Sequence, residues 1–530
     1  MYQPGPRGAA TVSCVPGFVS LVGAGPWDPG LLTLAGRDRL ARADVVIADY
    51  LANPALLSHC KPSARIIQRQ AGPRTGARLR QPQIHALLLE HARAGAHVVR
   101  LKGGDPVLFG RGGEEAQFLR AHRIPFEIVP GVPSAIAAAA TAGIPVTHRD
   151  VTPAVTFVSG YEAFEKLGSP VAWHHLAHAA GTLVFLMGIR NLRSNMERLV
   201  AAGRDPDTPA AAVRWGTRGI QRTITATVGS LADAVEAAGL RAPALVVIGE
   251  VVRMRETVAF FEDRPLFGRR VLVARAEGRG ADLIERLAAL GADVVFVPCL
   301  RYAPARPEDD VAEAVAWSEG VVVSSPTGAE RLAALLSGAG LDARALAGRT
   351  VAAIGTGTTR ALGRLGLRPD LVPDRAHSEG LVEALAAHGL LARRWLHVRG
   401  DDGRPVLERA VTRAGGTYRL LCVYRTERPA VAPLLVRSLR LPDEGGEGLD
   451  GIFVSSGRVL SNLRATLAEH LGTAAAGDLL ARTPLFGLGP VTADAAQAMG
   501  LRVAGVADAP TDAAAADLLA RTLGRRDGGS

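Results

Sequence analysis

The chain has 530 residues, of which 48% are hydrophobic and 21% charged, and its formal net charge is +10. This length predicts three or four compact units, and the composition and the lack of any apolar run of ~20 residues exclude a disordered chain and a membrane-spanning helix. The positive charge favours an anionic partner, but aromatic residues make up only 5% of the chain, so a polycarboxylated or phosphorylated small molecule is expected and nucleic acid is not.

The first residues, 1–15, predict a flexible tail, because "MYQPGPRGAATVSC" lacks the apolar segment of an export signal. The cysteines are scattered and predict neither a disulfide framework nor a zinc site; they are Cys14, Cys60, Cys299 and Cys422. We therefore expect a cytoplasmic protein that binds no metal ion and no membrane.

Short apolar runs alternate with helical patterns from residue 16 onward. The runs are "FVSLVGAG", "ARADVVIAD", "HVVRLKGG" and "PFEIVPG", and each is followed by residues with helical spacing. This alternation predicts an α/β fold with mainly parallel sheets, in which ligands lie beyond the carboxyl ends of the strands. A second apolar series, from residue 154 to 252, predicts a second α/β unit.

The stretch "LKGGDPVLFGRGGEE", residues 101–115, places five glycines directly after a predicted strand. Such density indicates a backbone with positive φ or a close approach by a ligand. A phosphate loop would need Lys and then Ser or Thr after the last glycine, and the carboxylate of Asp105 would repel phosphate. Asp105 suits a ligand with a hydroxyl or ammonium group. The alternative is a tight turn with a solvated carboxylate.

Residues 255–270 interrupt the pattern and predict a linker, after which the sequence repeats itself. "GVVVSSPTGAERL" resembles "GIFVSSGRVLSNL", and Ser456 lies 131 residues after Ser325. A second pair of similar stretches places Gly487 132 residues after Gly355. Two similar α/β lobes are therefore expected, each with a Ser-Ser turn and a Gly/Thr turn before a helix. These turns either form an anion site from hydroxyls and free N–H groups or are ordinary helix caps.

Both halves contain stretches that resemble known families. The first half contains "VSLVGAGPWDPGLLTLAG", "ADVVIADYL", "VVRLKGGDPVLFGRGGEE", "VPGVPSAIAAAATAGIPVTHRD" and "TLVFLMG". Together they resemble uroporphyrinogen III C-methyltransferase, of the tetrapyrrole methylase family. The second half contains "RVLVARA", "VVSSPTG", "AAIGTGTTRAL", "HSEGL", "HVRGDDGRPVLERA", "CVYRT" and "GLGPVTADAA", which resemble uroporphyrinogen III synthase.

The two resemblances imply an order of domains along the chain. The expected fold is a two-domain tetrapyrrole methylase followed by a two-lobed α/β synthase. The expected boundaries are a tail at 1–15, a methyltransferase at 16–260 with lobes at about 16–130 and 131–260, a linker at 261–268, a synthase at 269–525 and a tail at 526–530. The methylase resemblance also implies a homodimer through the first half.

The methylase resemblance implies a cleft that holds S-adenosylmethionine. Carried over residue by residue, its lining would be Pro26, Gly103, Gly104, Asp105, Leu108, Pro133, Ser134, Met187 and Gly216. Asp49 stands where the family has a candidate proton acceptor, and the alternative for a carboxylate at the end of a strand is a helix cap. Arg69 stands where relatives commonly have Lys as a proposed proton donor. Since arginine keeps its proton, Arg69 either has no acid role or anchors a substrate carboxylate.

Two further positions depart from the methylase pattern, and several others are expected to bind substrate. Trp27 replaces the Gly usual after "GAGP", and Tyr161 replaces a common His. The propionate and acetate groups of the substrate are expected to meet Arg111, His148 and Arg149, because arginine binds carboxylates with two hydrogen bonds. The alternative for each arginine is a structural ion pair.

The synthase resemblance implies that little side-chain chemistry is needed. Tyr424 in "VYRT" is the candidate that assists departure of a hydroxyl; as an ordinary half-buried tyrosine it would need no such role. An eight-carboxylate substrate would be held between the lobes by Arg275, Ser325, Thr356, Ser378, Arg399, Ser456 and Thr492.

Together the resemblances imply a bifunctional enzyme of tetrapyrrole biosynthesis. Its second half would cyclise hydroxymethylbilane to uroporphyrinogen III, and its first half would methylate that product twice, giving precorrin-2 on the way to sirohaem or a cobalamin. One alternative is a methylase that acts on a later corrin intermediate, on RNA or on protein. Another is a second half that binds or senses a tetrapyrrole without converting it. NAD chemistry is not expected, since "GAGPWD" lacks the last residue of the dinucleotide fingerprint.

Overall fold

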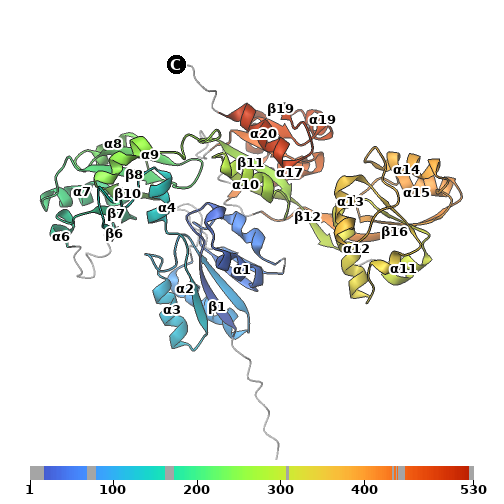
Figure 1. Ribbon diagram of the computed structural model, residues 1–530, viewed down its shortest axis with the longest axis horizontal. Helices are drawn as coiled ribbons and strands as arrows, with labels where there is room; N and C mark the ends of the chain where they lie inside the picture. Colours follow the sequence, from blue (N-terminus) through green and yellow to red (C-terminus); the bar gives the residue numbers. More distant parts are fainter. Residues whose placement is uncertain are drawn as a thin grey trace, which may run out of the picture.

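The computed structural model describes residues 17–61, 63–68, 79–161, 172–305, 310–431, 435–436, 439 and 448–524. The predicted tails at 1–15 and 526–530 and the candidate Arg69 lie outside these residues. Figure 1 shows the chain as a series of α/β units, coloured from blue at its start to red at its end. Among the described residues, no helix is both long and apolar enough to span a bilayer.

The first unit is built on a sheet of parallel strands in the order β3-β2-β4-β1-β5. Its elements are β1 Phe18–Gly23, η1 Pro29–Leu31, α1 Leu34–Arg42, β2 Val45–Ala48, η2 Pro54–His59, β3 Arg65–Gln68, α2 Gln81–Arg93, β4 His97–Lys102, α3 Gly112–Ala121 and β5 Phe126–Val129. The apolar strands are covered by helices on both faces, as a parallel sheet requires. Leu40 of α1 packs on one face and Leu88 of α2 on the other.

The second unit has a mixed sheet in the order β6-β7-β10-β8-β9. Its elements are α4 Ser134–Thr141, β6 Val155–Ser159, α6 Trp173–Ala177, β7 Thr182–Leu186, η3 Ile189–Asn191, α7 Leu192–Ala201, β8 Pro209–Arg214, β9 Arg222–Thr227, α8 Leu231–Ala237, β10 Ala244–Ile248, η4 Glu250–Met254 and α9 Arg255–Val258. β6 and β7 are parallel, whereas β10 runs antiparallel to β7 and β8, and β8 to β9. The prediction of mainly parallel sheets is wrong for this unit. The loop 215–221 joins β8 to β9 without the helix that a parallel crossover needs.

The segment predicted as a linker, 261–268, is packed against the units on either side of it. Phe261 and Leu266 are buried. The Glu262 carboxylate accepts hydrogen bonds from Gln221 at 3.2 Å and Thr223 at 2.9 Å. The segment therefore holds the second unit and the following sheet together rather than separating them.

The second half forms one continuous sheet in the order β14-β13-β15-β16-β12-β11-β17-β18-β19. One lobe contains β11 Arg270–Ala276, α10 Ala281–Ala289, β12 Asp293–Pro304, β17 Gly451–Val454, α17 Gly457–Leu471, α18 Thr473–Arg482, β18 Leu485–Gly487, α19 Pro490–Ala498, β19 Val503–Val506 and α20 Asp512–Leu523. The other lobe contains α11 Val311–Trp317, β13 Gly320–Val323, α12 Pro326–Gly338, η5 Ala343–Leu346, β14 Thr350–Ala353, α13 Gly355–Arg364, α14 Ser378–Ala387, β15 Arg394–Gly400, α15 Val406–Arg413 and β16 Thr417–Glu427. Figure 1 shows β12 passing from one lobe toward the other.

The two long strands β12 and β16 connect the lobes. Arg301 to Pro304 pair antiparallel with Glu427 to Tyr424, whereas the other pairs of neighbouring strands in this sheet are parallel. The chain thus begins in one lobe, builds the other and returns. The α/β fold class is confirmed, and the carboxyl ends of the parallel strands in each lobe lie along a single edge.

A buried histidine in β15 gives a pH-dependent prediction. His397 is 5% exposed, its Nδ1 lies 3.1 Å from the Tyr418 hydroxyl, and burial, with a smaller contribution from Arg399, lowers its pKa to about 3. Below the ordinary pKa of about 6.5, the unfolded chain binds a proton that the folded chain does not. The free energy of unfolding therefore decreases by up to about 1.4 kcal/mol for each unit by which the pH is lowered.

We expect His397→Gln to flatten this dependence. Urea unfolding of the full chain, followed at about pH 7 and again at about pH 5, should show the larger loss for the unsubstituted protein. An equal loss in both proteins would show that the imidazole is not held neutral by burial.

Candidate active sites

The loops that follow β1, β2 and β4 meet at the carboxyl edge of the first sheet. Because these strands are parallel neighbours, Pro26, Asp49 and Gly103 all lie at this edge. Gly25 and Gly104 exchange backbone hydrogen bonds of 3.2 and 2.8 Å, which join the first loop to the third. The sequence therefore brings three of its candidate positions to one place.

The glycine loop after β4 is braced by its own aspartate. One carboxylate oxygen of Asp105 accepts from the N–H groups of Val107 and Leu108 at 2.8 and 3.0 Å, and the other accepts from Gly131 N–H at 3.1 Å. The side chain therefore shapes the loop, and a ligand would have to use the remaining lone pairs. Gly104 has a φ of +70°. If this residue had a Cβ, the neighbouring atom within 4 Å of it would be the backbone nitrogen of Ser134, at 3.7 Å. This glycine leaves space above the loop.

The second sheet contributes loops that face the first. Met187 follows β7 and is half exposed, and Gly216 follows β8. A Cβ on Gly216 would lie 2.1 Å from the Cβ of Ala138, so this loop is pressed against α4. Leu108 from the first unit packs against the core that α4 shares with the second sheet. The candidate positions of the two units thus approach each other around α4, whose N-terminus carries Pro133 and Ser134.

Strained backbone is concentrated in these same loops. Among the described residues, positive φ values at residues other than glycine occur at Trp27, Phe109, Arg111, Arg123, Met187, Trp215 and Thr217. All of these except Arg123 lie in the loops after β1, β4, β7 and β8. Such conformations are unfavourable for side chains with a Cβ and are found where the surrounding structure enforces them, commonly at binding sites.

Asp49 belongs to a buried network of charges beneath β4. Its carboxylate accepts from Arg100 Nη2 at 2.7 Å, and Arg100 Nε and Lys102 Nζ lie 3.3 and 3.0 Å from the Glu115 carboxylate. Burial is the largest influence on Lys102 and lowers its pKa. The short helix η2 that follows is capped by Asn53 and not by Asp49. The helix-cap alternative for Asp49 therefore does not apply to this helix. The carboxylate is instead held in place by Arg100.

The predicted substrate-binding residues of the first half lie farther out. Arg111 forms two hydrogen bonds, of 2.9 and 2.7 Å, with Glu114, which is the ion-pair alternative for this arginine. His148 Nδ1 accepts from the N–H of Asp150 at 3.2 Å, and Arg149 is exposed. Tyr161, one of the departures from the methylase pattern, is also exposed.

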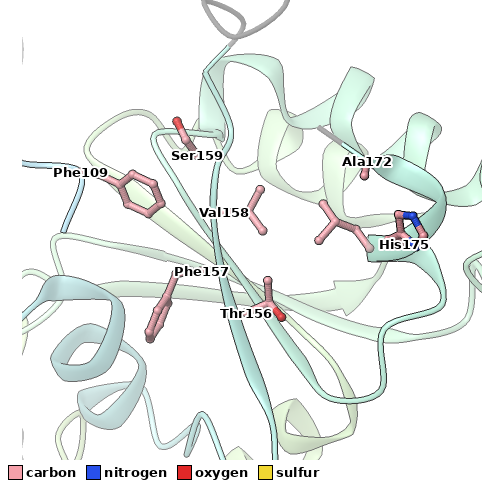
Figure 2. Close-up of a pocket in the computed structure, with 8 residues that line it drawn as sticks. Phe109, Thr156, Phe157, Val158, Ser159, Ala172 and His175 are labelled. Carbon is pink, nitrogen blue, oxygen red and sulfur yellow. The ribbon is translucent and has the colours of Figure 1, made fainter. Parts of the chain in front are cut away.

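Figure 2 shows an open apolar pocket beside β6, with Phe109 near the carboxyl end of that strand. Its volume is about 270 Å³, and it is lined by Phe109, Thr156, Phe157, Val158, Ser159, Ala172, His175 and Leu176. These residues are distinct from the positions predicted to bind S-adenosylmethionine. We therefore place the candidate cofactor site at the meeting of the strand loops and not in this pocket.

In the second half, Tyr424 lies at the junction of the lobes. Its hydroxyl is 3.1 Å from Ser325 Oγ, and its ring packs edge-to-face against Tyr302 with centroids 5.2 Å apart. Ser325 caps α12 by accepting from Gly328 N–H at 3.0 Å. The phenol thus sits next to a helix N-terminus, where N–H groups favour negative charge.

The remaining synthase candidates divide between the two lobes. Ser456 caps α17, Thr492 lies in the first turn of α19, and Thr356 is exposed in the first turn of α13. The Ser-Ser turns therefore do cap helices, in agreement with the capping alternative. Ser378 is the first residue of α14, whose cap is His377.

The two arginine candidates of the second half already have partners. Arg275 pairs with Asp512 at 2.6 Å, and Arg399 Nη1 donates to the Gly400 carbonyl at 3.4 Å. A substrate carboxylate at either position would have to share the guanidinium with these acceptors.

Some residues of these sites carried no signal in the sequence. Thr217 donates its hydroxyl to the Pro26 carbonyl and accepts from Asp28 N–H at 3.4 Å, so it fastens the second unit to the loop after β1. Arg458 of α17 pairs with Asp402 of the other lobe. Both contacts join segments far apart in the chain, and no local spacing predicts them.

The comparisons with known proteins agree with this division into halves. The family Tetrapyrrole (Corrin/Porphyrin) Methylases matches residues 19–232, and the family Uroporphyrinogen-III synthase HemD matches residues 281–517. The chain is 38% identical over 365 residues to the porphyrin biosynthesis protein HemD of Ruminiclostridium josui, which covers 68% of this chain and 71% of the relative.

Two further relatives match the first half. The chain is 46% identical over 242 residues to the S-adenosyl-L-methionine-dependent uroporphyrinogen III methyltransferase of Methanosarcina barkeri, which covers 45% of this chain and 94% of the relative. A solved structure of uroporphyrin-III C-methyl transferase from Thermus thermophilus, complexed with S-adenyl homocysteine, is 40% identical. It covers 45% of this chain and 99% of that chain, with a TM-score of 0.38.

The paired α/β units and the matching families define a bifunctional enzyme of tetrapyrrole biosynthesis. The chain belongs to the tetrapyrrole methylases in its first half and to the uroporphyrinogen III synthases in its second half, and is a fusion of the two. The resemblance found in the sequence is thereby confirmed, while the roles of individual residues and the domain boundaries stay predictions.

Proposed function

We propose that the second half converts hydroxymethylbilane to uroporphyrinogen III and that the first half transfers two methyl groups from S-adenosylmethionine to that product, giving precorrin-2. The observation that carries the methylase part is the meeting of strained loops from both sheets beside the N-terminus of α4. The two reactions are consecutive, since the product of the second half is the substrate of the first. The homodimer and the cytoplasmic location stay predictions, and precorrin-2 would lead either to sirohaem or to a cobalamin.

The residues at the meeting of the loops suit S-adenosylmethionine. Gly104 provides open space above its backbone, Asp105 provides carboxylate oxygens, and Met187 provides an apolar surface. We assign the cofactor to this set, completed by Pro26, Gly103, Leu108, Pro133, Ser134 and Gly216. When bound, the cofactor supplies an electrophilic methyl group.

The protein contributes mainly orientation to this reaction, because the pyrrole carbons of the substrate are already nucleophilic. The loops hold the two reactants in line and exclude water. After a methyl group has joined the ring carbon, a base must take up the displaced proton, and we assign this role to the Asp49 carboxylate. The ion pair with Arg100, at 2.7 Å, keeps that carboxylate pointing in one direction.

The methylase assignment predicts that Asp49→Asn lowers the rate of methyl transfer about a hundredfold or more, which is the usual contribution of a positioned base. Binding of S-adenosylhomocysteine, measured by calorimetry, should be unchanged. Asp44→Asn is the matched control, since Asp44 precedes the same strand and pairs with Lys61 at the surface. Equal rates for the two variants would contradict the role of Asp49.

In the synthase half, we assign departure of the substrate hydroxyl to Tyr424. Ser325 Oγ already accepts a hydrogen bond from Gly328 N–H, so its own hydrogen can point to the Tyr424 oxygen. The phenol hydrogen is then available to the leaving hydroxyl, which departs as water. The last ring subsequently inverts through a spiro intermediate and the macrocycle closes.

Tyr424→Phe is therefore expected to slow cyclisation about a hundredfold or more, the usual contribution of a positioned proton donor. Uroporphyrinogen III formed from hydroxymethylbilane would be measured by isomer analysis. Tyr418→Phe is the control, because Tyr418 lies on the same strand but contacts His397 in a different core cluster. Unchanged turnover in the Tyr424 variant would remove that residue from the mechanism, and a wild-type chain that binds the bilane without turnover would favour the sensing alternative.

A further inference from the structure

The two halves of the chain meet at a buried ion pair between Arg218 and Asp293. Arg218 lies in the loop between β8 and β9, close to Gly216, and Asp293 is the first residue of β12. The guanidinium Nε and Nη2 donate to the two carboxylate oxygens at 2.9 and 2.8 Å, and the side chains are 4% and 2% exposed. Arg270 Nε lies 3.1 Å from the same carboxylate. A buried pair with two parallel hydrogen bonds fixes the direction of both side chains.

Two tryptophans contact the same arginine. The guanidinium carbon of Arg218 lies 4.4 Å from the ring centroid of Trp27 and 4.4 Å from that of Trp215. Trp27 belongs to the loop after β1 and Trp215 to the loop after β8, and their rings are 6.1 Å apart. One cation thus contacts loops from both sheets of the methylase half through cation–π interactions.

The backbone of these loops depends on outside support. Trp27, Trp215 and Thr217 have φ values of +84°, +51° and +72°. Side chains with a Cβ adopt such values only where the surroundings hold them. Arg218, held by a carboxylate of the other half of the chain, contacts the rings of both Trp27 and Trp215.

Backbone contact accompanies the ion pair. Gly268 N–H donates to the Gly219 carbonyl at 2.7 Å. A Cβ on Gly219 would lie 2.3 Å from the backbone nitrogen of Asp293 and 2.2 Å from the carbonyl oxygen of Gly291. The loop therefore rests on the synthase half without an intervening side chain.

We propose that Asp293, a residue of the synthase half, positions the loop 215–221 of the methylase half and thereby sets the affinity of that half for S-adenosylmethionine. This inference rests on the proposed function, which places Gly216 in the cofactor site. Loss of the carboxylate would remove the bidentate partner of a buried guanidinium, and Arg218 would turn toward water together with its loop. Arg218 and Asp293 act through the loop and are positioning residues.

The ion pair between Arg218 and Asp293 is expected to affect the methylase half alone. Asp293 lies at the amino end of β12, whereas Ser456 and Thr492 follow the carboxyl ends of strands parallel to it. The contact and the candidate synthase site are therefore at opposite edges of the sheet. Cyclisation of hydroxymethylbilane should not depend on the ion pair.

The test uses Asp293→Asn in the full chain. We expect the Kd for S-adenosylhomocysteine and the KM for S-adenosylmethionine to rise about tenfold or more, with a smaller change in kcat, because a displaced loop loses contacts to the bound cofactor; tenfold corresponds to about 1.4 kcal/mol of binding free energy. Asp450→Asn is the matched control. Asp450 lies at the same edge and pairs with Arg269 at 3.1 Å and with the N–H of Arg270 at 2.8 Å. Its substitution should leave both constants unchanged.

Arg218→Lys is a second variant, to be used if Asp293→Asn fails to fold. It keeps the charge but loses the bidentate geometry, and it is expected to raise the same two constants. Unchanged Kd and KM in the folded variants would overturn the inference. So would a lower yield of active enzyme with an unchanged KM, because that result describes a purely structural contact. A wild-type chain that neither binds S-adenosylhomocysteine nor transfers methyl groups would instead contradict the proposed function.

Discussion

Replacing Glu115 with glutamine is expected to destabilise the methylase half by about 3–5 kcal/mol, the range for breaking a buried ion pair. Glu115 is fully buried, and its carboxylate accepts from Lys102 Nζ at 3.0 and 3.1 Å, from Arg100 Nε at 3.3 Å and from Gln81 Nε2 at 3.0 Å. Without this charge, two buried cations would share Asp49. Loss of a proton from Lys102, whose pKa burial already lowers, would relieve only one of them.

The adjacent residue provides the control for this experiment. Glu114 pairs with Arg111 at the surface, where their side chains are 52% and 53% exposed. Glu114→Gln should therefore change the free energy of unfolding by no more than about 1 kcal/mol. Urea unfolding of both variants would measure the difference. Similar stability in the two would show that the buried network is not needed for folding.

The second large effect is expected from Gly131→Ala. A Cβ at this position would lie 2.4 Å from the Gly104 carbonyl oxygen and 2.7 Å from the Gly23 Cα. These neighbours are backbone atoms, so the loops after β1, β4 and β5 would have to separate. The N–H of Gly131 also donates to Asp105, which shapes the glycine loop. We expect the affinity for S-adenosylhomocysteine to fall about tenfold or more, which corresponds to a loss of about 1.4 kcal/mol of binding free energy.

Calorimetry with S-adenosylhomocysteine would measure this loss. Gly113→Ala is the control, since Gly113 lies in the first turn of α3 and a Cβ there would meet nothing within 4 Å. That variant should bind as the unsubstituted chain does. If Gly131→Ala also binds normally, the cofactor does not depend on the packing of these loops.

The alternation of apolar runs and helical patterns predicted the first sheet, because parallel strands buried on both faces consist of continuous apolar residues. It did not predict the direction of the strands in the second sheet. The antiparallel pairing of β8 with β9 follows from the connection between Arg214 and Arg222, which is too short for a helix and contains no common hairpin dipeptide. The antiparallel pair therefore left no local signal.

The glycines of residues 101–115 show a similar limit. Their density correctly indicated a tight backbone, but only part of it leaves room for a ligand. A Cβ on Gly110 or Gly112 would lie 2.4 Å from the Pro106 carbonyl oxygen, and one on Gly103 would lie 2.8 Å from the Leu51 Cβ. Gly104 has open space instead. A sequence shows that glycine is required but not which neighbour requires it.

Long-range charge pairs were the least predictable part of the sites. Arg100 and Asp49 are 51 residues apart, and Arg218 and Asp293 are 75 residues apart. A resemblance to known families supplies candidate positions such as Asp49, but it does not supply the partners that orient them. Those partners follow from the topology, which places the carboxyl end of β2 beside β4 and the amino end of β12 beside the loop after β8.

The most direct test of the central claim is to incubate the purified full chain with hydroxymethylbilane and S-adenosylmethionine and to identify the products by mass and isomer analysis. We predict uroporphyrinogen III when the methyl donor is omitted, and a type III macrocycle with two added methyl groups when it is present. Uroporphyrinogen I as the sole macrocycle would contradict the synthase function, and a type III macrocycle without added methyl groups would contradict the methyltransferase function.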